Sequence, residues 1–261
     1  MKEYILAAAV IGAISVLVAP QASAFEWREE KGDHFIVNYT QEEGFAKEVR
    51  RYAETYYTRI ANDLGYTRFN YWQWDNRVKI YIYPSEKDYH DATGQPAWSK
   101  GSASYQTKSI STFAWNKEFN ETLLPHEIAH LIFRDFVGFE GEIPLWLDEG
   151  VAQWQEPATR DIARQAGYTV VNKRVMFPLE YFMSIYSMDG RDEATVQYFY
   201  MQALSVVDFL IRRHGLQSFS EFCRQLRDGH SMADALKAAY PASISNLKDL
   251  EKHWMEYVNT I

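Results

Sequence analysis

Two histidines four positions apart constrain this chain more than any other feature of its sequence. His126 and His130 flank Glu127 in a segment that is otherwise mostly apolar. On a helix, residues i and i+4 lie one turn apart on the same face, so both imidazoles can reach one ion. Glu127 lies about 100° round the helix from His126, where it can reach a water on that ion without binding the ion. Burying two imidazoles and a carboxylate is costly unless something satisfies them, so the segment predicts a divalent cation on a buried helix.

A metal site on this pair needs a third ligand, and the sequence offers one downstream. A third His at the metzincin spacing would stand six positions after His130, but Phe136 is found there. A carboxylate is available instead within Trp146-Leu-Asp-Glu-Gly150, and eighteen residues separate His130 from Glu149. That length is enough to end the first helix, turn and return antiparallel on a second helix.

His126-Glu-x-x-His130, followed after eighteen residues by Glu149, resembles the gluzincin zinc metallopeptidases. The pattern is most similar to the short peptidase MA-like bacterial proteins and, more distantly, to the M1 aminopeptidases. The resemblance implies that His126, His130 and Glu149 bind one Zn²⁺ and that Glu127 is the general base. Asp148 is a rival for the third ligand position. The implied reaction is the hydrolysis of peptide bonds in peptide or protein substrates by a zinc-activated water.

The resemblance also implies a donor for the oxyanion of the tetrahedral intermediate. These families place a Tyr at the head of a later helix, and Tyr200–Leu210 resembles that helix. Tyr200 is therefore the expected donor, with Tyr198 as the alternative. On the helix of Glu149, Gln153 and Glu156 lie at i+4 and i+7 on the same face. Glu156 is the expected carboxylate that orients a ligand imidazole, and a solvated surface position is the alternative interpretation.

The residues before the motif bear on the substrate. An edge strand commonly binds an extended peptide by strand addition, and the stretch 101–113 lies in the expected place. M1 aminopeptidases carry Gly-x-Met-Glu-Asn there, with the Glu holding the free amine of the substrate. This chain has Gly101-Ser-Ala-Ser104-Tyr105, with Ser104 in place of that Glu. The difference favours an endopeptidase, with Gly101 and Ser104 as the expected substrate-binding residues.

Hydrophobic periodicity predicts an α+β fold. Strands are expected at 34–40 and 78–83, with a long helix at 43–64 between them and one or two further strands within 101–115. The remainder is expected to be helical, at 121–137, 144–157, 193–214, 217–227, 231–240 and 244–259. The prediction is a small N-terminal mixed sheet with a long helix over residues 25–118. A mainly helical lobe carrying the zinc site follows over 119–261, with a zincin-like active site between the two.

Composition and the N-terminus indicate where such a protein works. Residues 1–24 combine a short apolar run with Ala22-Ser-Ala24, which predicts a signal peptide cleaved after Ala24. An uncleaved anchor is the alternative, and cleavage would leave a periplasmic or secreted protein without a membrane attachment. The single cysteine excludes an internal disulfide, and a net charge of −8 has the wrong sign for a nucleic-acid binder.

The sequence as a whole predicts an exported zinc-dependent endopeptidase. Two alternatives remain, namely a non-catalytic binding protein that keeps the metallopeptidase scaffold and an amidase that acts on cell-wall peptide. Glu127 favours catalysis, because a structural zinc site needs no base and usually has four protein ligands.

Overall fold

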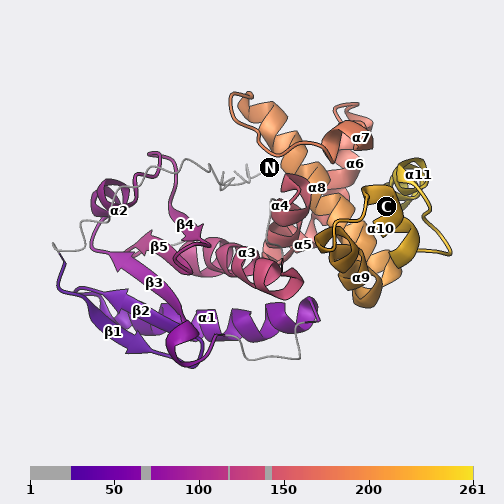
Figure 1. The fold of residues 1–261 in the computed structure, drawn as a ribbon. Helices are drawn as coiled ribbons and strands as arrows, with labels where there is room; N and C mark the ends of the chain where they lie inside the picture. Colours follow the sequence, from indigo (N-terminus) through magenta and orange to yellow (C-terminus); the bar gives the residue numbers. More distant parts are fainter. Residues whose placement is uncertain (1–24, 66–71, 117, 139–142, 261) are drawn as a thin grey trace. The chain divides into compact units, whose positions relative to one another are not determined.

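The computed structural model describes residues 25–65, 72–116, 118–138 and 143–260 (Figure 1). The predicted signal peptide lies outside these residues. The α+β prediction is confirmed, because a small mixed sheet and a long helix come first and helices follow. The chain divides into two compact units. The first unit contains the described residues up to Ile132, except Asp63–Gly65. The second unit contains Asp63–Gly65 and the described residues from Phe133 onward.

A five-stranded sheet forms the centre of the first unit. Its strands are β1 (Arg28–Lys31), β2 (Phe35–Tyr39), β3 (Val78–Tyr83), β4 (Gly101–Ser104) and β5 (Ser109–Phe113). Their order is β1-β2-β3-β5-β4. The three central strands are parallel, and β1 and β4 pair antiparallel at the two edges. β4 is therefore an edge strand, which is the position that the substrate hypothesis requires.

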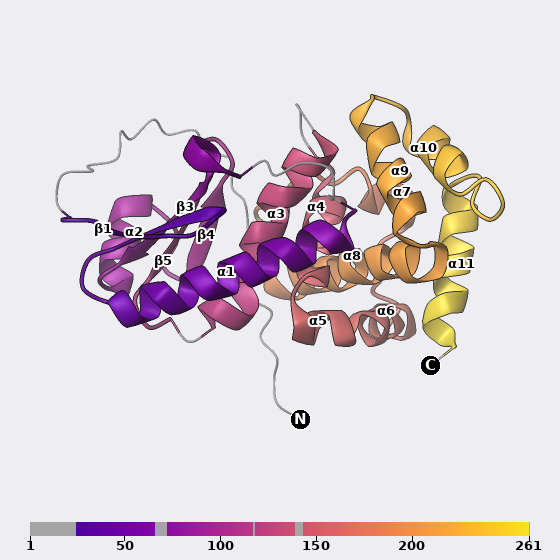
Figure 2. The same cartoon turned by 90° about the horizontal axis from the view of Figure 1, so that it is seen from below.

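Helices cover both faces of this sheet. α1 (Glu43–Asp63) runs across it in Figure 2 and buries an apolar stripe that includes Phe45, Val49 and Ile60. A short η1 turn (Trp74–Asn76) precedes β3. α2 (Glu86–Thr93) begins at the N-cap Ser85, and its Tyr89 contacts the rings of Tyr83 and Phe113. Because strand side chains alternate, these rings lie on the face opposite the buried Ile82.

A π-helical turn, η2 (Phe119–Leu123), leads into α3 (Leu124–Val137), and the boundary between the two units falls within this helix. The second unit is otherwise helical. It contains α4 (Leu145–Trp154), α5 (Pro157–Asp161), α6 (Ala163–Asn172), α7 (Leu179–Phe182), α8 (Glu193–His214), α9 (Leu216–Arg227), α10 (Met232–Ala239) and α11 (Leu247–Asn259). None of the helices among the described residues is both long enough and apolar enough to cross a membrane.

α8 is the central helix of the second unit, and α4 and α6 pack against it (Figure 1). The approach of α4 to α8 is close because residue 150 is a glycine. A Cβ atom at Gly150 would lie 2.6 Å from Val207 Cγ2 and 2.7 Å from the Ala203 carbonyl oxygen. The helix that carries the expected metal ligand Glu149 therefore packs directly on α8 through a residue without a side chain.

Candidate metal centre

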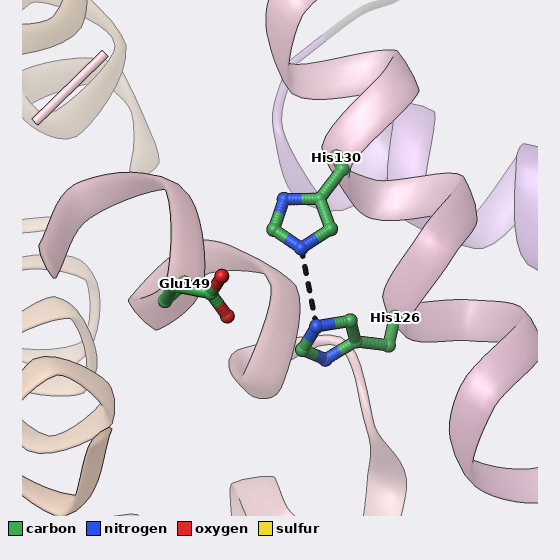
Figure 3. A group of neighbouring side chains, drawn as sticks. All are labelled: His126, His130 and Glu149. Carbon is green, nitrogen blue, oxygen red and sulfur yellow. Dashed lines mark hydrogen bonds between the residues drawn. The ribbon is translucent and has the colours of Figure 1, made fainter. Parts of the chain in front are cut away.

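The two motif histidines converge as the i, i+4 spacing predicts. His126 and His130 lie on α3, and each is 3% exposed. Their Nε2 atoms are 3.1 Å apart, and the two rings are almost perpendicular, at 77° (Figure 3). Both rings thus direct the same nitrogen towards one point, which is the arrangement that a shared ion would use.

Glu149 supplies a third donor from α4. One ligand atom each from His126, His130 and Glu149 lies within 4.8 Å of the others (Figure 3). Among the described residues this is the one group of His, Cys, Asp and Glu side chains that could hold a metal ion. Donors about 2.0–2.1 Å from a common Zn²⁺ are at most about 4.2 Å apart. Two imidazoles and one carboxylate form a donor set that suits zinc.

Glu127 has a buried carboxylate oxygen that accepts no hydrogen bond from the described residues. Its side chain is 1% exposed, and Oε1 accepts no hydrogen bond within the part of the chain that the structure describes. A buried carboxylate oxygen without a partner costs free energy, and such exceptions concentrate where a group from outside the chain is received. The position of Glu127, one residue after a candidate ligand, therefore fits a proton acceptor.

Asp148 has a different partner from Glu149. A nitrogen of the Arg134 guanidinium lies 3.8 Å from Asp148 Oδ2, and this ion pair joins the last turn of α3 to α4. Asp148 is absent from the metal-holding group, so the geometry favours Glu149 for the third donor. Arg134 follows His130 by four residues and so continues the face of the two imidazoles. Arg134 was not predicted from the sequence, although its spacing from His130 is visible there.

Tyr200 lies beside Glu149 within the helical unit. Its side chain is 2% exposed on α8, where the charge of the Glu149 carboxylate acts on its hydroxyl. Burial first, and then the charge of Glu149, raise the pKa of Tyr200 far above its ordinary value. Tyr198 is half-buried, and the Lys173 ammonium lies 5.7 Å from its ring centroid. Of the two tyrosines considered from the sequence, Tyr200 is the one in contact with a candidate ligand.

Glu156, the carboxylate expected to orient a ligand imidazole, does not lie on the helix of Glu149. α4 ends at Trp154, so Glu156 does not share a helical face with Glu149, and that part of the prediction is wrong. Glu156 is the N-cap residue of α5, and its Oε2 accepts a hydrogen bond of 2.6 Å from Thr159 Oγ1. Its orienting role stays a prediction.

Gln153, in contrast, contacts the backbone of both α4 and α8. It is 1% exposed, and its Nε2 donates to the backbone oxygens of Glu149 and Tyr200, both at 3.2 Å. A single amide thereby fastens the turn of α4 that carries Glu149 to the start of the buried part of α8.

The two residues expected to bind substrate, Gly101 and Ser104, begin and end β4. Ser104 Oγ accepts a hydrogen bond of 3.3 Å from the backbone N–H of Thr107 in the β4–β5 turn. The structure therefore places both residues on the edge strand, and their contact with substrate stays a prediction.

A sequence model of the peptidase MA superfamily matches residues 61–260, a stretch that contains the motif, Glu149 and Tyr200. The chain belongs to the peptidase MA superfamily. No curated protein sequence matches it. Membership of the peptidase MA superfamily gives the chain a metallopeptidase-like scaffold and implies peptide or protein substrates. The group formed by His126, His130 and Glu149 is the set of residues through which such a scaffold could hold its metal.

Proposed function

We propose that this protein is an exported, zinc-dependent endopeptidase of the gluzincin type, distantly similar to the M1 aminopeptidases. His126, His130 and Glu149 would hold one Zn²⁺, and the convergence of these three donors within 4.8 Å is the observation that carries the proposal. The superfamily match supports a peptidase scaffold. The sequence of residues 1–24 supports export to the periplasm or beyond the cell.

Zinc with three protein ligands supplies an open position at which water becomes more acidic and a carbonyl is polarised. Glu127 Oε1, which accepts no hydrogen bond among the described residues, takes a proton from the attacking water. The same carboxyl group then gives that proton to the leaving nitrogen. This double use requires a carboxylate that no neighbouring donor holds permanently.

Tyr200 is the proposed donor to the oxyanion. A donor must keep its proton, and the raised pKa of Tyr200 keeps the hydroxyl protonated across the physiological range. The hydroxyl would donate a hydrogen bond to the oxyanion as negative charge develops there during the reaction. Ser104 has no charge with which to bind a free amine, and this supports cleavage within a chain.

The test combines metal analysis with peptide cleavage. The purified protein is expected to contain about one zinc per chain and to cleave peptides whose N-termini are blocked. Glu127→Gln should lower kcat about 10²–10⁴-fold while zinc remains bound, because general-base catalysis is worth roughly that factor. Glu121→Gln, the same change at an exposed site on the preceding turn, is the matched control and should keep full activity.

Full hydrolysis by Glu127→Gln would overturn the mechanism. Zinc binding without hydrolysis of any peptide by the wild type would identify a binding protein on this scaffold. Cleavage confined to cell-wall peptides would identify the amidase alternative.

A further inference from the structure

Three hydroxyl groups meet where β4 begins. Tyr89, on α2, is fully buried, and its hydroxyl lies 2.8 Å from Ser99 Oγ and 3.3 Å from Ser102 Oγ. Ser99 Oγ in turn donates to the Gly101 carbonyl oxygen at 3.0 Å. This hydroxyl cluster, formed by Tyr89, Ser99 and Ser102, ties the first residues of the edge strand to the helix beneath them.

The other side of β4 is held by packing. A Cβ atom at Gly101 would lie 3.5 Å from Leu123 Cδ1 and 3.7 Å from Phe119 Cδ2. Both residues belong to the π-helical turn that leads directly into α3 and its motif. The strand is therefore held between α2 on one face and the start of the motif helix on the other.

The hydroxyl cluster also lies within electrostatic reach of Glu127. Burial is the largest cause that raises the pKa of Tyr89, and the charge of Glu127 raises it further, whereas Ser102 and Ser99 lower it. Glu127, Tyr89 and β4 all belong to the first unit. Leu123, which packs against Gly101, precedes Glu127 by four residues, so the clamped end of β4 also packs against the turn that leads to the proposed base.

We propose that Tyr89 is a positioning residue, which clamps β4 so that its outer edge presents the backbone of an extended polypeptide to Glu127. The inference rests on the proposed function, since it assigns a role in binding the substrate of that site. The substrate class is a peptide segment recognised through main-chain hydrogen bonds. The clamp consists of neutral hydroxyls, so it fixes the strand without selecting for a charged substrate side chain.

The test is Tyr89→Phe, which removes one oxygen and keeps the ring in place. Losing the clamp lets the strand move before it binds, so KM is expected to rise about tenfold while kcat changes less than about twofold. Ser102→Ala added to Tyr89→Phe should raise KM little further, because both changes remove the same interaction.

Tyr83→Phe is the matched control. Tyr83 lies on the same sheet face and contacts the Tyr89 ring, but its hydroxyl is bonded to Ser111 on β5 rather than to β4. KM is expected to be unchanged in this variant. Ser99→Ala and Ser102→Ala provide the same test if Tyr89→Phe does not fold.

A second readout does not depend on hydrolysis. Backbone hydrogen exchange of the peptide containing β4 should be about tenfold faster in Tyr89→Phe than in the wild type, and unchanged in Tyr83→Phe, with zinc content equal in all three. If the wild type cleaves no peptide, the proposed function fails while the exchange experiment still tests the clamp. The inference is overturned if Tyr89→Phe matches Tyr83→Phe in KM and exchange, or if kcat falls while KM stays constant.

Discussion

Two buried carboxylates, Asp208 in the helical unit and Glu127 in the sheet unit, differ in how many hydrogen bonds they accept. In the helical unit, Asp208 is 1% exposed and accepts hydrogen bonds from Trp154 Nε1 at 2.9 Å, Tyr257 Oη at 2.9 Å and Arg212 Nε at 2.6 Å. In the sheet unit, Glu127 Oε1 and Asn120 Oδ1 are buried and accept no hydrogen bond from the residues that the structure describes.

This difference separates a carboxylate that stabilises the fold from one that is available for chemistry. A buried carboxylate with three donors contributes to a rigid unit, whereas one with a vacant oxygen lowers stability and can receive a proton from outside the chain. Functional groups often carry such a cost, which the rest of the fold must offset.

The strongest test of this difference is to neutralise each of the two carboxylates and to compare the effects on stability. Asp208→Asn disturbs a satisfied buried network and should lower the free energy of unfolding by about 3 kcal/mol. Glu127→Gln in the zinc-free protein removes a buried charge with an unsatisfied oxygen and should be neutral or stabilising by up to about 1 kcal/mol. Urea unfolding of both variants measures the difference, and equal losses would contradict it.

Gly150→Ala tests the close packing of the helical unit. The new methyl group would overlap Val207 and the Ala203 carbonyl, so we expect a loss of about 2–3 kcal/mol of stability. Gly44→Ala is the matched control, because that glycine lies on α1 with nothing within 4 Å of its Cβ position. This control should be neutral or stabilising by up to about 1 kcal/mol. Thermal unfolding of both variants measures this difference in stability. If Gly150→Ala is as stable as the wild type, α4 can shift on α8.

Tyr200→Phe tests whether Tyr200, in the helical unit, helps Glu149 to bind zinc. The variant removes a buried hydroxyl that interacts with the charge of Glu149, and the loss of such a neighbour should weaken zinc binding roughly tenfold. Tyr198→Phe, on the same helix, should leave the affinity unchanged. Competition with a chelator gives the zinc Kd of each, and equal values would leave Tyr200 with the oxyanion role alone.

The smallest expected effect lies in the sheet unit and depends on pH. Burial opposes ionisation of Glu54, but hydrogen bonds with the His34 ring and backbone outweigh it, so the pKa of Glu54 lies below its ordinary value of 4.5. A lowered pKa in the folded state stabilises fully above about pH 4.5, and the contribution is lost as pH falls through the folded value.

Glu54→Gln should therefore flatten the fall in stability below pH 4.5. The size is about 0.5 kcal/mol, since the Glu54 side chain is 21% exposed and solvent screens it. Unfolding measured from pH 6 to pH 3 checks this, with the exposed Glu48→Gln as control. If the free energy of unfolding falls with pH as steeply in Glu54→Gln as in the wild type, the Glu54–His34 pair does not contribute to this pH dependence.

Strong periodicity explains which elements the sequence predicts. α1, β3 and α8 bury regular apolar stripes, and each was expected within a residue or so of its observed bounds. β1 is composed of charged residues, and α2 buries only Tyr89, so neither shows a pattern. α5 and α7 have only five and four residues, and α6 buries mainly small residues, so none of these three helices shows a clear apolar stripe.

At the candidate site, the motif predicts the three donors because their chemistry and spacing are local. The error over Glu156 had a signal in the sequence, since the residue before a proline avoids the helical region and Pro157 follows it. Glu156 indeed has an extended backbone, with φ −79° and ψ 119°. The vacant oxygen of Glu127 and the hydroxyl cluster could not be predicted, because both depend on which residues distant in sequence come together.

The shortness of β4 sets a limit on what its outer edge can do. Four residues offer a guest chain only a few main-chain hydrogen bonds, so little affinity can come from pairing alone. The same brevity makes the strand a poor template for a second copy of itself, which guards against self-association. If β4 binds substrate as proposed, its shortness allows brief pairing with a peptide and disfavours stable pairing between two copies of the protein.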